Sequence, residues 1–290
     1  MGAYVVQTPD GPGLVDCGPA STFGALKAGL EERGLSVGDL RHLLLTHIHL
    51  DHAGAAGLLV RENPALRVHV AEEGLFHLTF PEVLEFGARE VYGDQFDELW
   101  GEVVAVPEAN LEALEERVAG FEAIPTPGHA PHHFSYLAAD GTLYAGDAAG
   151  MRTEPERFVL PPMAPPDVDV AAWQRTISEL EARRPSCLAL THFGLVTDPS
   201  AHLATLRERL TDWEAAVRNG ITQEQFVEKV RAEVRALGAP PTFVEVAAAP
   251  ALELVRDLAR HVLELVGRPA GEEQDVRARS HSIEYSAPLH

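Results

Sequence analysis

Short apolar runs recur along the first two-thirds of the chain, and turn sequences separate them. The run "AYVVQT", the turn "PDGPG" and the run "LVD" predict a β-hairpin over residues 3–16. Buried strands are predicted by the runs "RHLLLTH", "LRVHVA", "FEAIPTPGH", "HFSYLAA", "GTLYAGD" and "SCLALTH". Apolar residues at helical spacing predict helices over residues 21–33, over "AGAAGLLVRE" and after Asp169. The order strand, strand, helix, strand, helix, strand occurs once and is approximately repeated later in the chain. This repetition indicates an α/β fold of two stacked halves.

An irregular segment at about residues 80–114 separates the two halves. It is aromatic and acidic, and we interpret it as a helical insertion or lid, not as part of a sheet. Its aromatic side chains suit the wall of a substrate cleft, but core contacts of an ordinary helix pair explain them equally well. The aromatic residues are Phe80, Phe86, Tyr92, Phe96 and Trp100.

The last third of the chain carries helix signals. Asp198 followed by Pro199 is typical of a cap and first turn, and Thr222 with Gln225 resembles a capping box. Between these two predicted helix N-termini, apolar residues at helical spacing form one stripe: Leu203, Leu206, Leu210, Trp213 and Val217.

These patterns divide the chain into three parts. Residues 1–197 form an α/β core with the insertion, and residues 198–267 form a helical region that ends with a helix at roughly 250–266. A polar tail follows at residues 268–290. The striped helices and the tail make a homodimer plausible.

Composition narrows the range of partners. The chain has 290 residues, 46% of them hydrophobic, so it can bury a sizeable core. Its formal charge of -21 comes from 44 acidic against 23 basic residues. Such a field repels phosphate backbones and anionic lipid, so we expect a small-molecule substrate rather than nucleic acid or a membrane.

The two cysteines and the first residues bear on location. Cys17 and Cys187 are too few for a disulfide framework, and both lie in or beside apolar stretches. The start "MGAYVVQTPDG" lacks a basic region followed by an apolar one, and no apolar run approaches the roughly 18 residues of a membrane span. We therefore expect a cytoplasmic protein.

The stretch "LLLTHIHLDHAGA" concentrates polar chemistry at the end of a predicted buried strand. His47 and His49 are two residues apart in extended chain, so their side chains point to the same side. Asp51 and His52 follow where a helix begins, and both can face the same point. Imidazoles and a carboxylate are ligands that zinc prefers. The alternative is that Asp51 caps the helix and the histidines form an exposed polar loop.

Three later residues share this placement. His129 in "TPGHAPHH", Asp147 in "YAGDAAG" and His192 in "LALTHFG" each stand where an apolar strand meets a glycine-containing loop. Taken singly, each is more often a core histidine or a turn aspartate. Together with the first cluster they provide seven possible ligands, enough for two metal ions.

The motif "THIHLDH", followed by these three residues, resembles the metallo-β-lactamase superfamily over residues 3–196. The resemblance implies an αββα four-layer sandwich with a dinuclear centre at one edge. One metal would be held by His47, His49 and His129, and the other by Asp51, His52 and His192, with Asp147 bridging. It also implies that Asp16 in "LVDCG" supports loops or ligands from behind.

Two divalent ions, expected to be Zn²⁺ with Fe or Mn also compatible, would supply a bridging hydroxide as nucleophile. Asp51 would ligate the second ion and also orient the nucleophile or carry a proton. The resemblance therefore implies a dinuclear metallohydrolase that cleaves a small ester, lactone or thioester, as in the lactonase and glyoxalase II branches.

Two other activities of the superfamily remain as alternatives. One is a mononuclear iron persulfide dioxygenase, which shares the first motif but uses one metal. The other is a phosphodiesterase, which the charge of -21 disfavours. A scaffold without activity would be expected to have lost ligands, and all seven positions are intact.

Residues beside the motif have less definite roles. "PGHAPHHFS" resembles the "PGHxPGH" run of lactonase-like members, which implies a supporting role for His133. His132 stands where that run has glycine, and we interpret it as a structural or substrate-facing group rather than an eighth ligand. Arg152 is expected to be structural. No spacing joins the remaining histidines to the site, including His42, His69, His77, His202 and His261.

Overall fold

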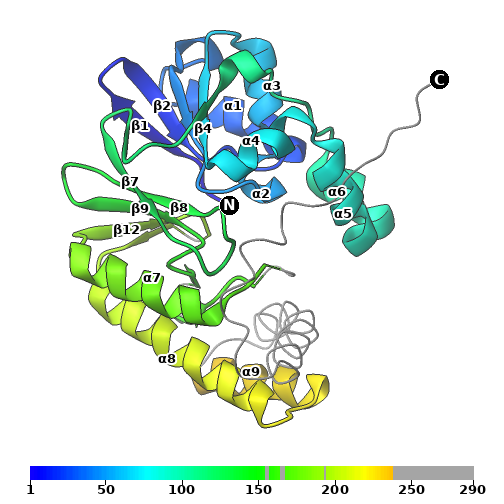
Figure 1. Cartoon of the computed structure of the whole chain (residues 1–290), viewed down its shortest axis with the longest axis vertical. Coiled ribbons are helices and arrows are strands. Elements are labelled where there is room, and N and C mark those ends of the chain that lie inside the picture. The colour runs from blue at the N-terminus through cyan, green and yellow to red at the C-terminus, as the bar shows by residue number, and fades with distance from the viewer. Residues whose placement is uncertain (154–156, 164–166, 193, 238–290) are drawn as a thin grey trace, which may run out of the picture.

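The computed structural model describes residues 1–153, 157–163, 167–192 and 194–237. The N-terminal half builds a five-stranded sheet (Figure 1). Its strands lie in the order β1 (Tyr4–Thr8), β2 (Gly11–Val15), β3 (His42–Leu44), β4 (Arg67–Val70) and β5 (Leu111–Ala113). β1 and β2 form the predicted hairpin, and β2 to β5 pair in parallel.

The second sheet has six strands. They lie in the order β13 (Gly194–Val196), β12 (Cys187–Leu190), β9 (Thr142–Gly146), β8 (Phe134–Leu137), β7 (Phe121–Pro125) and β6 (Arg117–Val118). β12 and β9 pair in parallel, and the other neighbours pair antiparallel. A separate ribbon pairs β10 (Met151–Arg152) with β11 (Val159–Leu160). The strands predicted at "FEAIPTPGH", "HFSYLAA", "GTLYAGD" and "SCLALTH" are all confirmed.

Helices cover the outer faces of both sheets. The α-helices are α1 (Phe23–Glu31), α2 (Leu50–Ala53), α3 (Ala56–Glu62), α4 (Glu72–Thr79), α5 (Glu82–Tyr92), α6 (Phe96–Trp100), α7 (Val170–Arg183), α8 (Pro199–Arg218) and α9 (Gln223–Ala236). Short 3-10 turns occur at Ala20–Thr22, Val37–Asp39, Gly93–Gln95 and Glu108–Asn110. α1 and α3 lie on the first sheet, and α7 and α8 lie on the second (Figure 1).

The alternation of side chains along the strands explains the layering. On β3, Leu43 packs with the helix-covered core, whereas Leu44 packs with Phe121 and Tyr136 between the two sheets. Both leucines are fully buried, because a strand inside a sandwich has no solvent face. The predicted αββα four-layer fold is therefore confirmed.

The segment at about residues 80–114 is helical, as predicted, except at its C-terminal end, which forms a strand. α5 and α6 are helical, but Leu111–Ala113 form β5 and pair with β4. β5 is a three-residue edge strand that includes Glu112, so it shows no apolar period that could reveal it. The aromatic residues also divide, since Phe96 is fully buried whereas Phe86 is 69% exposed.

The C-terminal helices follow their sequence signals with one exception. The apolar stripe of α8 is buried, and the capping box of Thr222 and Gln225 is present. Asp198 makes no capping hydrogen bond through its side chain. Its carboxylate instead accepts a hydrogen bond of 2.6 Å from Arg152, which confirms a structural role for that arginine. The helix predicted at 250–266 and the tail at 268–290 lie outside the described residues.

Within the described part of the chain, no helix has the length and apolarity needed to cross a membrane.

Candidate metal centre

The candidate ligands stand beyond the ends of β3, β7, β9 and β12, where the two sheets are tied to each other. The Phe134 amide donates to the carbonyl of Thr46 (2.8 Å), and the Tyr136 hydroxyl donates to the carbonyl of Leu45 (2.5 Å). These bonds link β8 to the chain that leaves β3. The histidine-rich stretch is therefore fixed to the opposite sheet at the point where the ligands begin.

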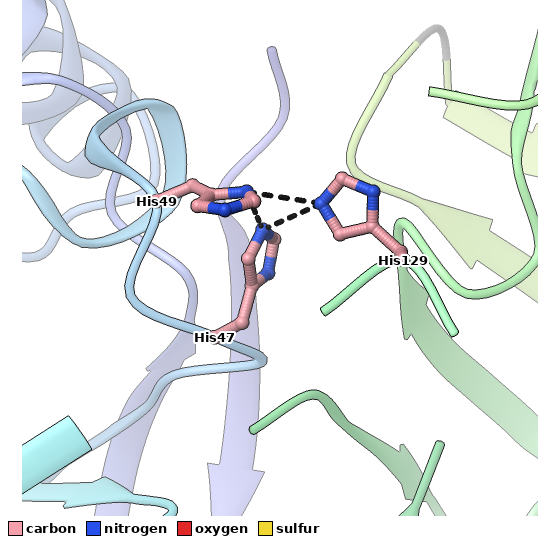
Figure 2. A group of neighbouring side chains, drawn as sticks. All are labelled: His47, His49 and His129. Carbon is pink, nitrogen blue, oxygen red and sulfur yellow. Dashed lines mark hydrogen bonds between the residues drawn. The ribbon is translucent and has the colours of Figure 1, made fainter. Parts of the chain in front are cut away.

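His47, His49 and His129 form the first group of donors, and Figure 2 shows their rings converging. Nε2 of His47 lies 2.9 Å from Nδ1 of His49, and Nε2 of His129 lies 3.2 Å and 3.0 Å from these two atoms. A neutral imidazole nitrogen is either a donor or an acceptor, so three nitrogens cannot all be paired with one another. A cation at the centre of the triangle would satisfy all three.

The hydrogen bond of His129 on its far side determines its orientation. Its Nδ1 lies 2.7 Å from the carbonyl of Pro162, which can only accept, so the proton is on Nδ1. Nε2 therefore presents a lone pair to His47 and His49. This is the arrangement that a metal-binding histidine requires.

Asp51, His52 and His192 form the second group. Oδ2 of Asp51 lies 3.5 Å from Nε2 of His52 and 3.4 Å from Nε2 of His192. The carboxylate of Asp147 joins the two groups. Its Oδ1 lies 3.4 Å from Nε2 of both His52 and His192, and its Oδ2 lies 3.3 Å from Nε2 of His129.

These separations fit a pair of metal ions. Bonds of about 2.0–2.1 Å in tetrahedral geometry place neighbouring ligand atoms about 3.3 Å apart. Nε2 of His52 and Oδ1 of Asp147 lie between the two groups of donors. Both atoms are buried with no hydrogen-bond partner among the described residues. A divalent ion would satisfy both.

The alternative of a helix cap with exposed histidines is wrong. The residue at the N-cap of α2 is His49, which makes no capping bond, and Asp51 lies within the helix. His47 and His52 are fully buried. His47 and His52 therefore face the junction of the sheets, and His49 and Asp51 are only partly exposed.

The two groups differ in their electrostatics. Burial holds the pKa of His47 and His129 below the usual value and lowers that of His49 to about 3. Burial acts the same way on His52, but the carboxylates of Asp147 and Asp51 outweigh it and raise its pKa well above the usual value. The first group is therefore neutral near pH 7, whereas in the absence of metal His52 is protonated.

Asp16 supports the second group from behind, as the sequence predicted. Its Oδ2 accepts from Nδ1 of His52 at 2.8 Å and from the Thr191 hydroxyl at 3.1 Å, and its Oδ1 accepts from the Thr46 amide at 2.8 Å. Its φ of +55° lies in the left-handed region. The structure adds Thr46 and Thr191, which the sequence interpretation missed. The signal was the repeated "TH" in "LLLTH" and "LALTH".

His133 supports Asp147, again as predicted. Its Nε2 accepts from the Asp147 amide at 3.1 Å, and its Nδ1 pairs with the Thr126 hydroxyl at 2.8 Å. His132 lies beside the first group but belongs to neither set of donors.

The comparisons with known proteins agree with this geometry. A family model described as the metallo-beta-lactamase superfamily matches residues 3–192. The metallo-beta-lactamase fold-containing protein ST1585 of Sulfurisphaera tokodaii is 28% identical over 210 residues, which are 68% of this chain and 78% of that protein. The solved ST1585 structure has a TM-score of 0.58 at 22% identity and covers 87% of this chain and 92% of its own.

Two further likenesses are more local or more distant. The structure of TTHA1623 in a di-iron-bound form has a TM-score of 0.51 at 26% identity, with 70% of this chain and 90% of that chain covered. A hydroxyacylglutathione hydrolase of Glaesserella parasuis serovar 5 is 33% identical over 107 residues, only 37% of this chain and 34% of that enzyme. Since the family model spans well over half of the sequence, the chain belongs to the metallo-beta-lactamase superfamily.

Proposed function

We propose that this chain is a dinuclear metallohydrolase that cleaves a small ester, lactone or thioester with water as the nucleophile. Membership of the superfamily supports metal-dependent hydrolase chemistry. The observation that carries the dinuclear proposal is Asp147, whose two oxygens face different donor groups at 3.3 and 3.4 Å. One carboxylate placed in this way can be shared between two ions.

The ligand set follows from the two groups. His47, His49 and His129 would hold one ion, and Asp51, His52 and His192 would hold the other, with Asp147 shared. Two bound divalent ions would lower the pKa of a water between them and polarise the substrate carbonyl. Zinc suits these nitrogen and oxygen donors, and iron or manganese could use the same set. A structural neighbour, TTHA1623, has a di-iron-bound form.

Asp51 would have a second role besides binding metal. Its side chain is 22% exposed, whereas that of Asp147 is 4% exposed, so Asp51 is the carboxylate that solvent and substrate can reach. Burial acts to raise its pKa, but His52 and His192 lower it to about 2. A carboxylate that stays ionised is a hydrogen-bond acceptor, so we assign Asp51 to orienting the attacking water rather than to carrying a proton.

The proposed substrate class rests on the exclusion of other superfamily activities and on short sequence similarities to known hydrolases. The charge of -21 disfavours nucleic acid. The six donors in two groups, with Asp147 between them, are more than a mononuclear iron dioxygenase needs. The short match to hydroxyacylglutathione hydrolase is consistent with a thioester, and the "PGHAPHH" run with a lactone. The shared chemistry of these substrates is an activated carbonyl.

A substrate screen tests the proposal. Anaerobically purified protein of measured metal content is assayed with lactones, thioesters, aryl esters and phosphodiesters, and oxygen uptake is followed with sulfur substrates. We expect hydrolysis of at least one carbonyl class, lost in Asp51→Ala and retained in His69→Gln, a matched variant outside the site. One iron per chain together with oxygen uptake would overturn the proposal.

A further inference from the structure

Side chains from two helices hold the turn that begins with Asp147, the carboxylate that faces both donor groups. Nε1 of Trp173 on α7 donates to the carbonyl of Ala148 (2.7 Å). Nε2 of His202 on α8 lies 2.7 Å from the carbonyl of Ala149. A carbonyl only accepts, so the ring proton of His202 is on Nε2. Two ring N–H groups therefore hold consecutive carbonyls of one turn.

The turn and both of its donors are buried, which gives these bonds their weight. A buried carbonyl that loses its donor is costly, because water does not replace the lost partner. On the other side of the turn, the amide of Asp147 donates to Nε2 of His133 at 3.1 Å. The backbone that carries the Asp147 carboxylate is therefore fixed both from the two helices and from His133.

Trp173 also contacts the segment that carries His129. Its ring lies edge-on to the His129 ring, with centroids 5.8 Å apart. Gly128 lies so close to α7 that a Cβ there would be 2.4 Å from Cα of Trp173. One turn further along α7, the Thr176 hydroxyl donates to the carbonyl of Pro127 (2.6 Å). One face of α7 therefore contacts both the segment that leads to His129 and the turn of Asp147.

His202 connects the C-terminal helical region with the centre. α8 packs beside α7 on the second sheet (Figure 1). Nδ1 of His202 has no partner among the described residues, so within them its hydrogen bonding is the bond to Ala149. An apolar side chain would fill this buried space without leaving a nitrogen unpaired. The bond to the turn therefore accounts for a histidine at this position.

We propose that Trp173 and His202 are positioning residues that place the Asp147 carboxylate between the two donor groups and so determine whether the second ion is retained. This inference rests on the dinuclear centre of the proposed function. Oδ1 of Asp147 faces two members of the second group, His52 and His192, whereas its Oδ2 faces one member of the first. A displaced carboxylate therefore weakens the ion of the second group more than that of the first.

Titration of the metal-loaded protein with a chelator tests this role without relying on hydrolysis, because it gives an affinity for each of the two ions. Trp173→Phe keeps a ring and removes the N–H, and His202→Leu removes the donor to Ala149. We expect each variant to bind the more weakly held ion about 10- to 100-fold less tightly, the usual effect of removing a residue that supports a metal ligand. The affinity for the other ion should change less.

Two further variants separate positioning from general stability. The side-chain amide of His202→Gln can donate to the same carbonyl, so this variant should recover most of the lost affinity. Trp213→Phe is the matched control, because Trp213 is equally buried on α8 but its N–H has no partner among the described residues. It should keep both affinities. In cobalt-loaded protein, the magnetic coupling of the two ions in EPR spectra should persist in Trp213→Phe and diminish in Trp173→Phe.

Wild-type affinities in both Trp173→Phe and His202→Leu would overturn the inference. A loss in His202→Gln equal to that in His202→Leu, or an equal loss in Trp213→Phe, would overturn it as well. If His202→Leu does not fold, the comparison of Trp173→Phe with Trp213→Phe decides alone. Two ions with the expected pattern but no hydrolysis would reject the proposed activity alone, whereas fewer than two ions in wild type would overturn both.

Discussion

Oδ2 of Asp16 lies 2.8 Å from Nδ1 of His52, and this contact determines which nitrogen of the imidazole faces the centre. A carboxylate can only accept, so the proton stays on Nδ1 and Nε2 points to Asp51 and Asp147. A side chain that binds no substrate thus controls the geometry of one that is proposed to bind metal.

Replacing Asp16 with asparagine tests this control. Asparagine keeps the size and tolerates the φ of +55°, but its amide can donate to Nδ1 and so favour the wrong tautomer. We expect Asp16→Asn to weaken binding of one ion by about 10- to 100-fold. Competition with a chelator measures this loss. Thr191→Val, which removes only one bond to Asp16, should have a much smaller effect.

Acidification should remove the ion of the second group before that of the first. In the second group the pKa of His52 is raised, so binding must displace a proton and affinity falls as pH falls, by up to about tenfold per unit. In the first group burial holds the pKa of His49 at about 3, so no such loss occurs near neutrality. We expect dialysis from about pH 8 to about pH 5.5 to leave one ion per chain.

Site variants show which ion remains. Asp51→Ala protein, which keeps the first group, should retain its ion at lower pH than His49→Ala protein does. The reverse order, or simultaneous loss of both ions in wild type, would contradict the assigned electrostatics.

Gly128, next to His129, is expected to tolerate no side chain. Its φ is +140°, and a Cβ there would lie 2.4 Å from Cα of Trp173 on α7. Gly128→Ala must therefore move the backbone that carries His129, at a cost of about 2 kcal/mol or more in free energy of unfolding. Gly87→Ala on α5 is the control, because no atom lies within 4 Å and alanine should stabilise the helix by about 0.5–1 kcal/mol. Urea unfolding measures both, and equal stabilities would contradict the packing.

A histidine pair away from the centre should make stability depend on pH. Nδ1 of His42 lies 2.8 Å from Nε2 of His69, and burial lowers the pKa of His69 from 6.5 to about 4. The unfolded chain takes up this proton first, so stability is complete above pH 6.5 and falls as pH drops toward 4, by up to about 1.4 kcal/mol per unit. Denaturant unfolding of His69→Gln should show a shallower decline, and parallel curves would contradict this assignment.

Local patterns were sufficient to predict two stacked α/β halves and the seven candidate residues, whereas the αββα layers were implied by the resemblance to the superfamily. The apolar runs of β3 and β12 are continuous, and His47 and His49 follow from the two-residue period of extended chain. The buried face of α8 was also predictable, because a helix buries residues at a fixed spacing along the sequence.

Contacts between distant segments were not predictable in this way. β5 forms because β4 offers a free edge, not because its three residues favour a strand. Asp198 has the position of a helix cap, but Arg152, 46 residues earlier, takes its carboxylate.

Metal content per chain tests the central claim most directly, that seven residues hold two ions with Asp147 between them. Elemental analysis after dialysis near pH 8 should give two ions for wild type and for His69→Gln, about one for His49→Ala, and fewer than two for Asp147→Ala. One ion in wild type, or two ions and full hydrolytic activity in both His49→Ala and Asp147→Ala, would contradict the claim.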